Sequence, residues 1–144
     1  DLSRNAFGDG GGVPLAKSLR TNTKLLTLQV DECMLTDASA RKFQKALRVN
    51  SRLSRLTMAW NGLEAQGAID MLQAVLTSHK ERSSSSLSSR GSALRHLDLA
   101  SNTFGSYLDS VTAEQSSLLL SLKDRALLQI GLVVKLGFIY GGSA

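Results

Sequence analysis

The amino-acid sequence predicts an α/β solenoid in which about three to four repeats, each a short strand, a turn and a helix, stack side by side. Residues 53–63 (LSRLTMAWNGL) alternate apolar and outward positions as a strand does and end in an Asn turn. Similar stretches recur at two steps of 28 residues before it and one step of 41 residues after it. Aromatic residues make up only 5% of the chain and proline occurs once, which suits a core of stacked aliphatic side chains.

The turn slot that closes each strand fixes the register of the repeats. It is occupied in turn by Asn5, Cys33, Asn61 and Asn102. We expect an Asn side chain there to bond backbone groups that the turn leaves unpaired, and a small buried thiol to fill the slot at Cys33. Replacing Asn61 should therefore destabilise the chain, whereas Asn50, in a connecting turn, should matter less.

Repeats of 28 residues with a helix after the Asn turn resemble leucine-rich repeats of the ribonuclease-inhibitor type. That family carries a Gly six residues after the Asn. Gly11 and Gly67 match this position, whereas Ser39 and Leu108 do not. The resemblance covers residues 1 to about 104 and implies a leucine-rich-repeat solenoid, a segment of a horseshoe.

The phrases that close one helix and open the next strand carry a further resemblance. Residues 20–25 (RTNTKL) and 48–53 (RVNSRL) are similar to those of intracellular members of the family, including NOD-like receptors and the actin-regulatory CARMIL proteins. The resemblance implies a non-catalytic protein-interaction scaffold whose partner is another, unidentified protein.

The first two repeats each predict one helix. Pro14 marks the start of a short helix, because its fixed φ suits a first helical turn, and residues 10–12 form a flexible glycine turn before it. In the second repeat Thr36 or Asp37 can cap a helix that runs to about Arg48.

A basic stripe is predicted on the outward side of the second helix. It consists of Arg41, Lys45, Arg48 and Arg52 at helical spacing. Two interpretations stay open, a patch for an acidic partner or lipid, and a solvated helix face.

The third and fourth repeats are less regular. We predict a leucine-rich-repeat segment over residues 1–120 with a polar Ser-rich loop at residues 79–93, which has too little apolar surface to offset the entropy of ordering. Residues 121–144 form an apolar C-terminal tail, interpreted either as a cap on the solenoid or as sequence foreign to the family. The tail is too short and too interrupted, by Gln129 and Lys135, for a membrane span.

Composition and motifs argue against catalysis and for an intracellular location. The net charge of +5 permits weak attraction to acidic partners but does not single out nucleic acid, which is not expected to bind. His79 and His96 lack a second Cys or a carboxylate cluster at metal spacing, so we predict no enzyme, no metal and no cofactor. A single cysteine and the absence of a signal peptide favour an intracellular, cytoplasmic protein. Because the chain starts within a strand, we expect it to be a fragment of a larger protein.

The outward residues of successive strands should align as columns on the concave face. The candidate binding residues are Trp60, Glu32, Arg4, Asp31, Gln29, Thr57 and Asp98. Trp60 is the strongest candidate, because a half-exposed Trp is the residue type most enriched among binding hot spots. The alternative is that its ring packs on the neighbouring repeat beside Glu32 or Arg4.

Two narrower functions follow from the resemblance. Residues 15–25 (LAKSLRTNTKL) resemble a repeat near the end of the CARMIL solenoid, which implies a regulator of actin filament assembly. The other alternative is the ligand-sensing repeat domain of a NOD-like immune receptor.

Overall fold

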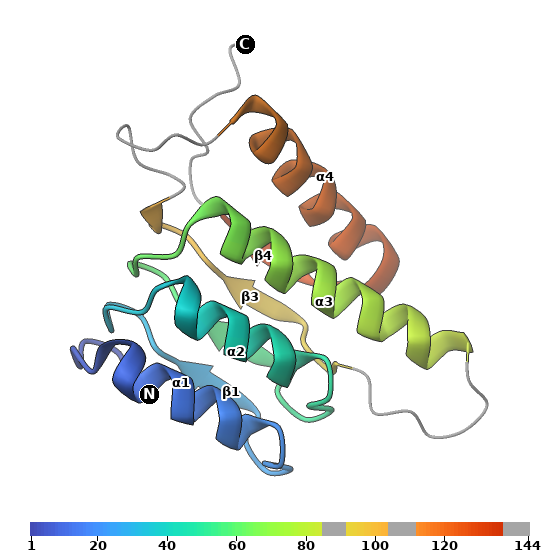
Figure 1. The fold of residues 1–144 in the computed structure, drawn as a ribbon. Coiled ribbons are helices and arrows are strands. Elements are labelled where there is room, and N and C mark those ends of the chain that lie inside the picture. The colour runs from blue at the N-terminus through green and yellow to red at the C-terminus, as the bar shows by residue number, and fades with distance from the viewer. Residues whose placement is uncertain (85–91, 104–111, 137–144) are drawn as a thin grey trace.

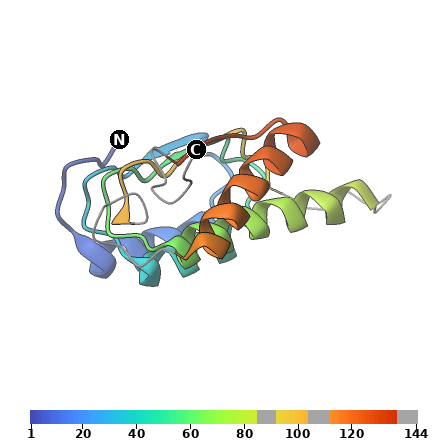
Figure 2. The same ribbon diagram turned by 90° about the horizontal axis from the view of Figure 1, so that it is seen from above.

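The computed structural model describes residues 1–84, 92–103 and 112–136, which form alternating helices and strands (Figure 1). Their order is α1 (Gly8–Leu19), β1 (Thr27–Gln29), α2 (Asp37–Leu47), β2 (Arg55–Thr57), α3 (Ala65–Ser84), β3 (His96–Asp98), α4 (Ala113–Ile130) and β4 (Val133–Lys135). The strands form one parallel sheet in the order β1-β2-β3-β4. Seen from above, the helices form one layer and the strands another (Figure 2), so each repeat is a single strand-turn-helix unit.

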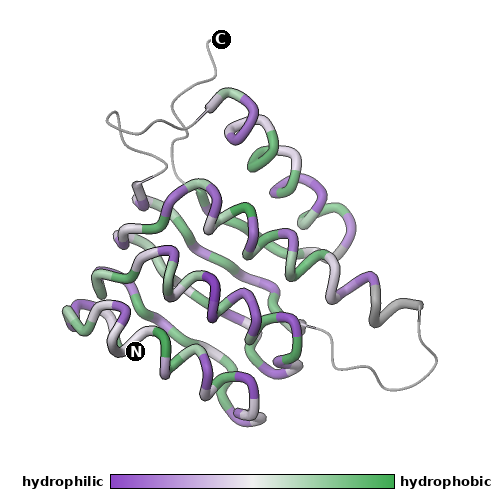
Figure 3. Tube along the Cα trace, viewed as in Figure 1, coloured by the Kyte–Doolittle hydropathy of each residue, from purple (hydrophilic) through white to green (hydrophobic). Residues whose placement is uncertain are grey.

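The core lies between the two layers. The central residues of the strands pair in register, Leu28 with Leu56, Leu56 with Leu97 and Leu97 with Val134. All four side chains are buried, as the alternation of apolar and polar residues predicts. Figure 3 shows this alternation along the strands and, at the longer helical period, along the helices. The predicted α/β solenoid is therefore confirmed.

The Asn slots join each repeat to the one before it. Asn61 Oδ1 accepts hydrogen bonds from the backbone amides of Cys33 and Leu35, each at 3.0 Å. Its Nδ2 donates to the carbonyl of Val30 in the preceding repeat at 2.9 Å and to that of Met58 in its own repeat at 3.1 Å. One side chain thus pairs backbone groups in two repeats. Because its own polar atoms are hydrogen-bonded as well, the side chain can be buried.

The other slots follow the same pattern. Asn102 Oδ1 accepts from the amide of Leu63 at 3.1 Å, and its Nδ2 donates to the carbonyl of Met58 at 2.9 Å. The thiol of Cys33 donates to the carbonyl of Leu2 at 3.2 Å. The expectation that a buried thiol substitutes for Asn in this slot is confirmed.

Asn50 is buried and hydrogen-bonded in its turn, as Asn61 is in its own. It is only 3% exposed, and its Nδ2 donates to the carbonyls of Leu19 at 2.6 Å and of Asn22 at 3.0 Å. Its Oδ1 accepts from the amides of Arg52 and Leu53. The helix-to-strand turn, like the strand-to-helix turn, thus has backbone groups that a side chain pairs, and the expectation that Asn50 matters less than Asn61 stays a prediction.

The helix starts are held by carboxylates that reach into the next repeat. Asp9 Oδ1 accepts from the amide of Thr36 at 3.0 Å and from the hydroxyl of Ser39 at 2.6 Å. Asp37 does the same one repeat later, accepting from the amide of Glu64 at 2.8 Å. A Cβ at Gly67 would clash with Asp37 Oδ1, so the glycine admits that carboxylate.

Helix α1 starts earlier than predicted. It begins at Gly8 rather than near Pro14, which lies in its interior, and the residues expected as a glycine turn are helical. The backbone amide of Gly8 donates to the carbonyl of Cys33 at 2.9 Å, and Asp9 bonds Thr36 and Ser39. These contacts with the next repeat offset the low helix propensity of glycine.

The predicted boundaries in the second half of the chain also need correction. Residues 79–84 of the predicted loop at 79–93 belong to α3, and residues 85–91 lie outside the described residues. The boundary at 120/121 falls inside α4, and β4 pairs with β3. The described part of the predicted tail is therefore built into the solenoid, with Leu132, Val134 and Leu136 buried in the same core.

We predict that Asn50 and Asn61 are both structural. Asn61→Ala leaves the amides of Cys33 and Leu35 unpaired and should lower the free energy of unfolding by about 2 to 4 kcal/mol. Asn50→Ala should cost about 1 to 3 kcal/mol. Urea unfolding measures both. Asn5→Ala is the control, because Asn5 is exposed; an equal effect at Asn5 and Asn50 would contradict the assignment.

The carboxylate of Asp9 should make stability depend on pH. Partial burial opposes its ionisation, but hydrogen bonds from Ser39 and Thr36 outweigh burial and lower the pKa below 3.8. Its stabilisation is therefore complete at pH values well above 3.8 and is lost as the pH falls through 3.8 toward the lowered pKa. Thermal melts of Asp9→Asn should show a smaller loss of stability in acid than the wild type. Asp124→Asn, on the exposed side of α4, should melt like the wild type.

Candidate functional site

The predicted columns are present on the face of the sheet turned away from the helices. Thr27, Arg55 and His96 pair across one column, and Gln29, Thr57 and Asp98 across the next. Beyond the strands the backbone continues in the same register, with the amide of Glu32 donating to Ala59 and that of Trp60 donating to Ala100. The predicted alignment is therefore correct, although the residues in it differ in how accessible they are.

Thr57 is not an accessible binding residue. It is 4% exposed, and its hydroxyl donates to Asp31 Oδ2 at 2.9 Å. The other carboxylate oxygen of Asp31 accepts from the amide of Ala59 at 2.7 Å. The expectation that Thr57 faces a partner is wrong because Thr57 is buried and its hydroxyl is hydrogen-bonded to Asp31 of the preceding repeat.

Asp98 is committed to neighbouring residues as well. Its Oδ1 accepts from the amide of Ala100 at 3.1 Å, and its Oδ2 lies 3.4 Å from Lys135 Nζ. Gln29 is half-buried beside β2. The centre of this face is therefore largely occupied by contacts between repeats.

Arg4, Glu32 and Trp60 lie together at the strand exits, and all three are exposed. Each occupies the position before the Asn or Cys slot, and each has a positive φ, between 55° and 62°. Ser101, the fourth member of this column, has a φ of 56°. The left-handed backbone is thus required by the repeat, whereas the identity of the residue in it is not.

Trp60 lies on an open groove together with Met34. The groove has a volume of about 590 Å³ and is lined by Glu32, Met34, Leu35, Thr36, Trp60, Asn61 and Gly62. Trp60 and Met34 are each 66% exposed, so neither ring nor thioether is packed away on the neighbouring repeat. The floor of the groove is fixed by Asn61 and Leu35, which are buried. We call this feature the Trp60–Met34 groove.

Two comparisons with known proteins bear on this arrangement. A family model described as "Leucine Rich repeat" matches residues 1–16. A solved structure titled "Leiomodin-1 Actin-Binding Site 2 (ABS2)" matches with a TM-score of 0.68 at 14% sequence identity, over 98% of this chain and 70% of that one. The described residues have the leucine-rich-repeat fold. The four parallel strands, each followed by its turn, give this protein the fold that its sequence predicts.

Sequence reasoning missed Met34 as a residue of this groove. Met34 follows the Cys33 slot, two residues before Thr36, and its φ of 61° turns the side chain away from the core. The same slot holds Gly62 in the next repeat. The sequence does show a large apolar residue at this turn position, where the repeat does not require an apolar side chain.

No three His, Cys, Asp or Glu side chains come together as metal ligands within residues 1–84, 92–103 and 112–136. Cys33 is a free, buried thiol used in the Asn slot. No helix in these same ranges is long and apolar enough to cross a membrane.

His96 lies on the same face and should lower stability in mild acid. Burial is the main cause that lowers its pKa below 6.5; Arg55 and Lys135 add to this, and Asp98 opposes it. Because the unfolded chain binds a proton at His96 more readily than the folded chain, stability is lost as the pH falls below about 6.5.

We therefore expect His96→Gln to melt at a higher temperature than the wild type at about pH 5, and to differ less at about pH 8. Calorimetry at both pH values measures this. If the wild type loses no more stability than the variant between about pH 8 and about pH 5, protonation of His96 does not destabilise the folded chain.

Proposed function

We propose that this leucine-rich-repeat protein is a protein-binding scaffold whose partner docks on the Trp60–Met34 groove. The observation that carries the proposal is the exposure of two large apolar side chains, 66% each, on one groove with a rigid floor. Exposed apolar groups gathered at one place mark interaction sites more often than scattered ones do.

The residue choice at the groove supports a binding role. The repeat requires a left-handed backbone at Trp60, which costs a residue other than Gly about 1 to 2 kcal/mol. Ser101 meets the same requirement with a small polar side chain. Neither the turn nor the core therefore requires a Trp here, whereas a partner that buries its ring would.

The polar rim of the groove complements its apolar centre. Glu32 lines the groove and pairs with Arg4 at 3.3 Å, an exposed ion pair that contributes little to stability. Such a pair can exchange partners on binding and set orientation and association rate. A protein surface with an apolar residue near a basic one would fit both parts.

Actin is the first partner to test. The similar solved structure is titled as an actin-binding site of leiomodin-1, and the sequence itself resembles actin-regulatory repeats at residues 15–25. At 14% identity the similarity supports a common fold and no more, so an actin-regulatory role is part of the proposal. An actin partner also implies an intracellular location, which suits the free thiol of Cys33.

The test uses purified chain and fluorescently labelled monomeric actin in a titration, with filament co-sedimentation beside it. Trp60→Asn removes the ring and keeps a residue that tolerates the left-handed backbone. We expect it to weaken binding by about 2 kcal/mol or more, roughly thirtyfold. Met34→Ser should weaken binding by about 1 kcal/mol.

Leu128→Ser is the matched control, because Leu128 is a large apolar residue of α4 that is 85% exposed and distant in sequence from the groove. It should bind actin as the wild type does. Binding that survives both groove substitutions would move the site elsewhere on the fold. If actin does not bind at all, the proposal of an actin partner is wrong, and the groove is then tested with proteins that co-purify with the wild type and not with Trp60→Asn.

A further inference from the structure

Basic residues gather along α2 and at the edge of the solenoid opposite to the Trp60–Met34 groove, where helices end and the next strands begin. Residues 15–26 and 41–55 contain nine Lys and Arg residues and no Asp or Glu. They are Lys17, Arg20, Lys24, Arg41, Lys42, Lys45, Arg48, Arg52 and Arg55. All are exposed except Lys42, which is half-buried. We call these residues the basic edge.

Six of these residues form pairs one repeat apart. Lys17 aligns with Lys45, Arg20 with Arg48, and Lys24 with Arg52, each at the 28-residue spacing of the repeats. Stacked repeats thus place like charges beside one another, which is unfavourable without a counter-charge. Apart from Arg48, none of the nine forms an ion pair with a carboxylate among the described residues.

Helix electrostatics account for only part of the basic edge. A cation in the last turn of a helix is favoured by the helix dipole, which explains Lys17 in α1 and Lys45 in α2. Lys24 and Arg52 lie beyond the helix ends, in the turns that lead to β1 and β2. The prediction that placed Arg52 on the outward stripe of the second helix is corrected here, because α2 ends at Leu47.

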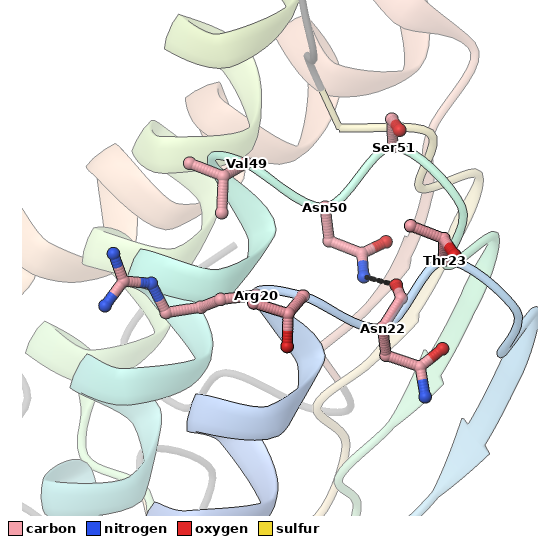
Figure 4. Close-up of a pocket in the computed structure, with 7 residues that line it drawn as sticks. Arg20, Asn22, Thr23, Val49, Asn50 and Ser51 are labelled. Carbon is pink, nitrogen blue, oxygen red and sulfur yellow. Dashed lines mark hydrogen bonds between the residues drawn. The ribbon is translucent and has the colours of Figure 1, made fainter.

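A hollow of about 350 Å³ lies within the basic edge, between the turns of the first two repeats. Arg20, Asn22, Thr23, Val49, Asn50 and Ser51 surround it in Figure 4, with Asn50 bonded to the carbonyl of Asn22. Val49 is partly exposed and gives the hollow an apolar wall. The buried side chain of Asn50 holds both turns in place, so the hollow has a fixed shape.

We propose that the basic edge binds an acidic, extended segment of a partner protein, whose carboxylates pair with the cation columns and one of whose apolar side chains enters the hollow beside Val49. The occupant is inferred from charge complementarity, since eight of the nine cations, all but Arg48, form no ion pair with a carboxylate among the described residues. This site is separate from the groove of the proposed function and does not depend on it.

The other anionic macromolecules fit less well. Phe43 is the one aromatic residue within residues 15–26 and 41–55, and it is buried. The turns therefore offer neither the aromatic anchors of a membrane surface nor the stacking platforms of single-stranded nucleic acid. A recessed hollow with hydrogen-bonding groups suits a side chain of a peptide rather than a flat bilayer.

The test measures binding of a labelled synthetic peptide of alternating Glu and Leu to the full chain by fluorescence anisotropy. A peptide with Gln in place of Glu is the control for charge. We expect saturable binding of the acidic peptide that weakens with salt, and at least about tenfold weaker binding by the double variant Lys24→Glu, Arg52→Glu. The neutral double variant Lys24→Gln, Arg52→Gln should fall between it and the wild type.

Lys123→Glu with Arg125→Glu is the matched control, because it changes the net charge equally on α4, away from the basic edge. It should bind the peptide within about twofold of the wild type. Equal losses in both charge-reversed variants would overturn the proposal, because only net charge would then matter. Tighter binding of anionic vesicles or of an oligothymidine than of the peptide would also overturn it, as would the absence of saturable peptide binding.

Discussion

Unpaired backbone groups at the two turns of each repeat are the constraint on which this structure depends. A three-residue strand pairs few of its own amides and carbonyls, and the turns beside it are too tight for regular hydrogen bonds. Asn61 solves this at the strand exit and Asn50 at the strand entry, each bonding backbone groups in two repeats. Stacking of the apolar core then follows, because these bonds fix the register in which Leu28, Leu56 and Leu97 meet.

The same constraint produces the Trp60–Met34 groove and the hollow of the basic edge. At the strand exits the backbone becomes left-handed one residue before the Asn slot, which turns Trp60 outward over the floor made by Asn61 and Leu35. At the helix ends Asn50 fixes the turns that form the hollow of the basic edge. Acidic residues such as Asp9 and Asp37 begin helices, whereas basic residues end them, so the helix dipoles also contribute to the charge difference between the edges.

The sequence predicts the strands, their register and the Asn slots because these are local patterns with a fixed period. It does not predict the extent of α1 or α3. The glycines at residues 10–12 are helical because contacts with the next repeat hold the start of α1, and α3 continues through the polar residues 79–84. Nor does it show that Thr57 is buried and Met34 exposed. Thr57 donates its hydroxyl to Asp31, and Met34 is turned outward by its φ of 61°, neither of which the periodicity of apolar residues encodes.

Hydrogen–deuterium exchange of the backbone amides tests the account most directly. Cys33 and Leu35 lie outside the strands, and only Asn61 Oδ1 accepts from their amides among the described hydrogen bonds. The account predicts that both exchange as slowly as the amide of Val30, which is bonded to the next strand. Exchange of Cys33 and Leu35 as fast as that of Thr23, in an exposed turn, would contradict it.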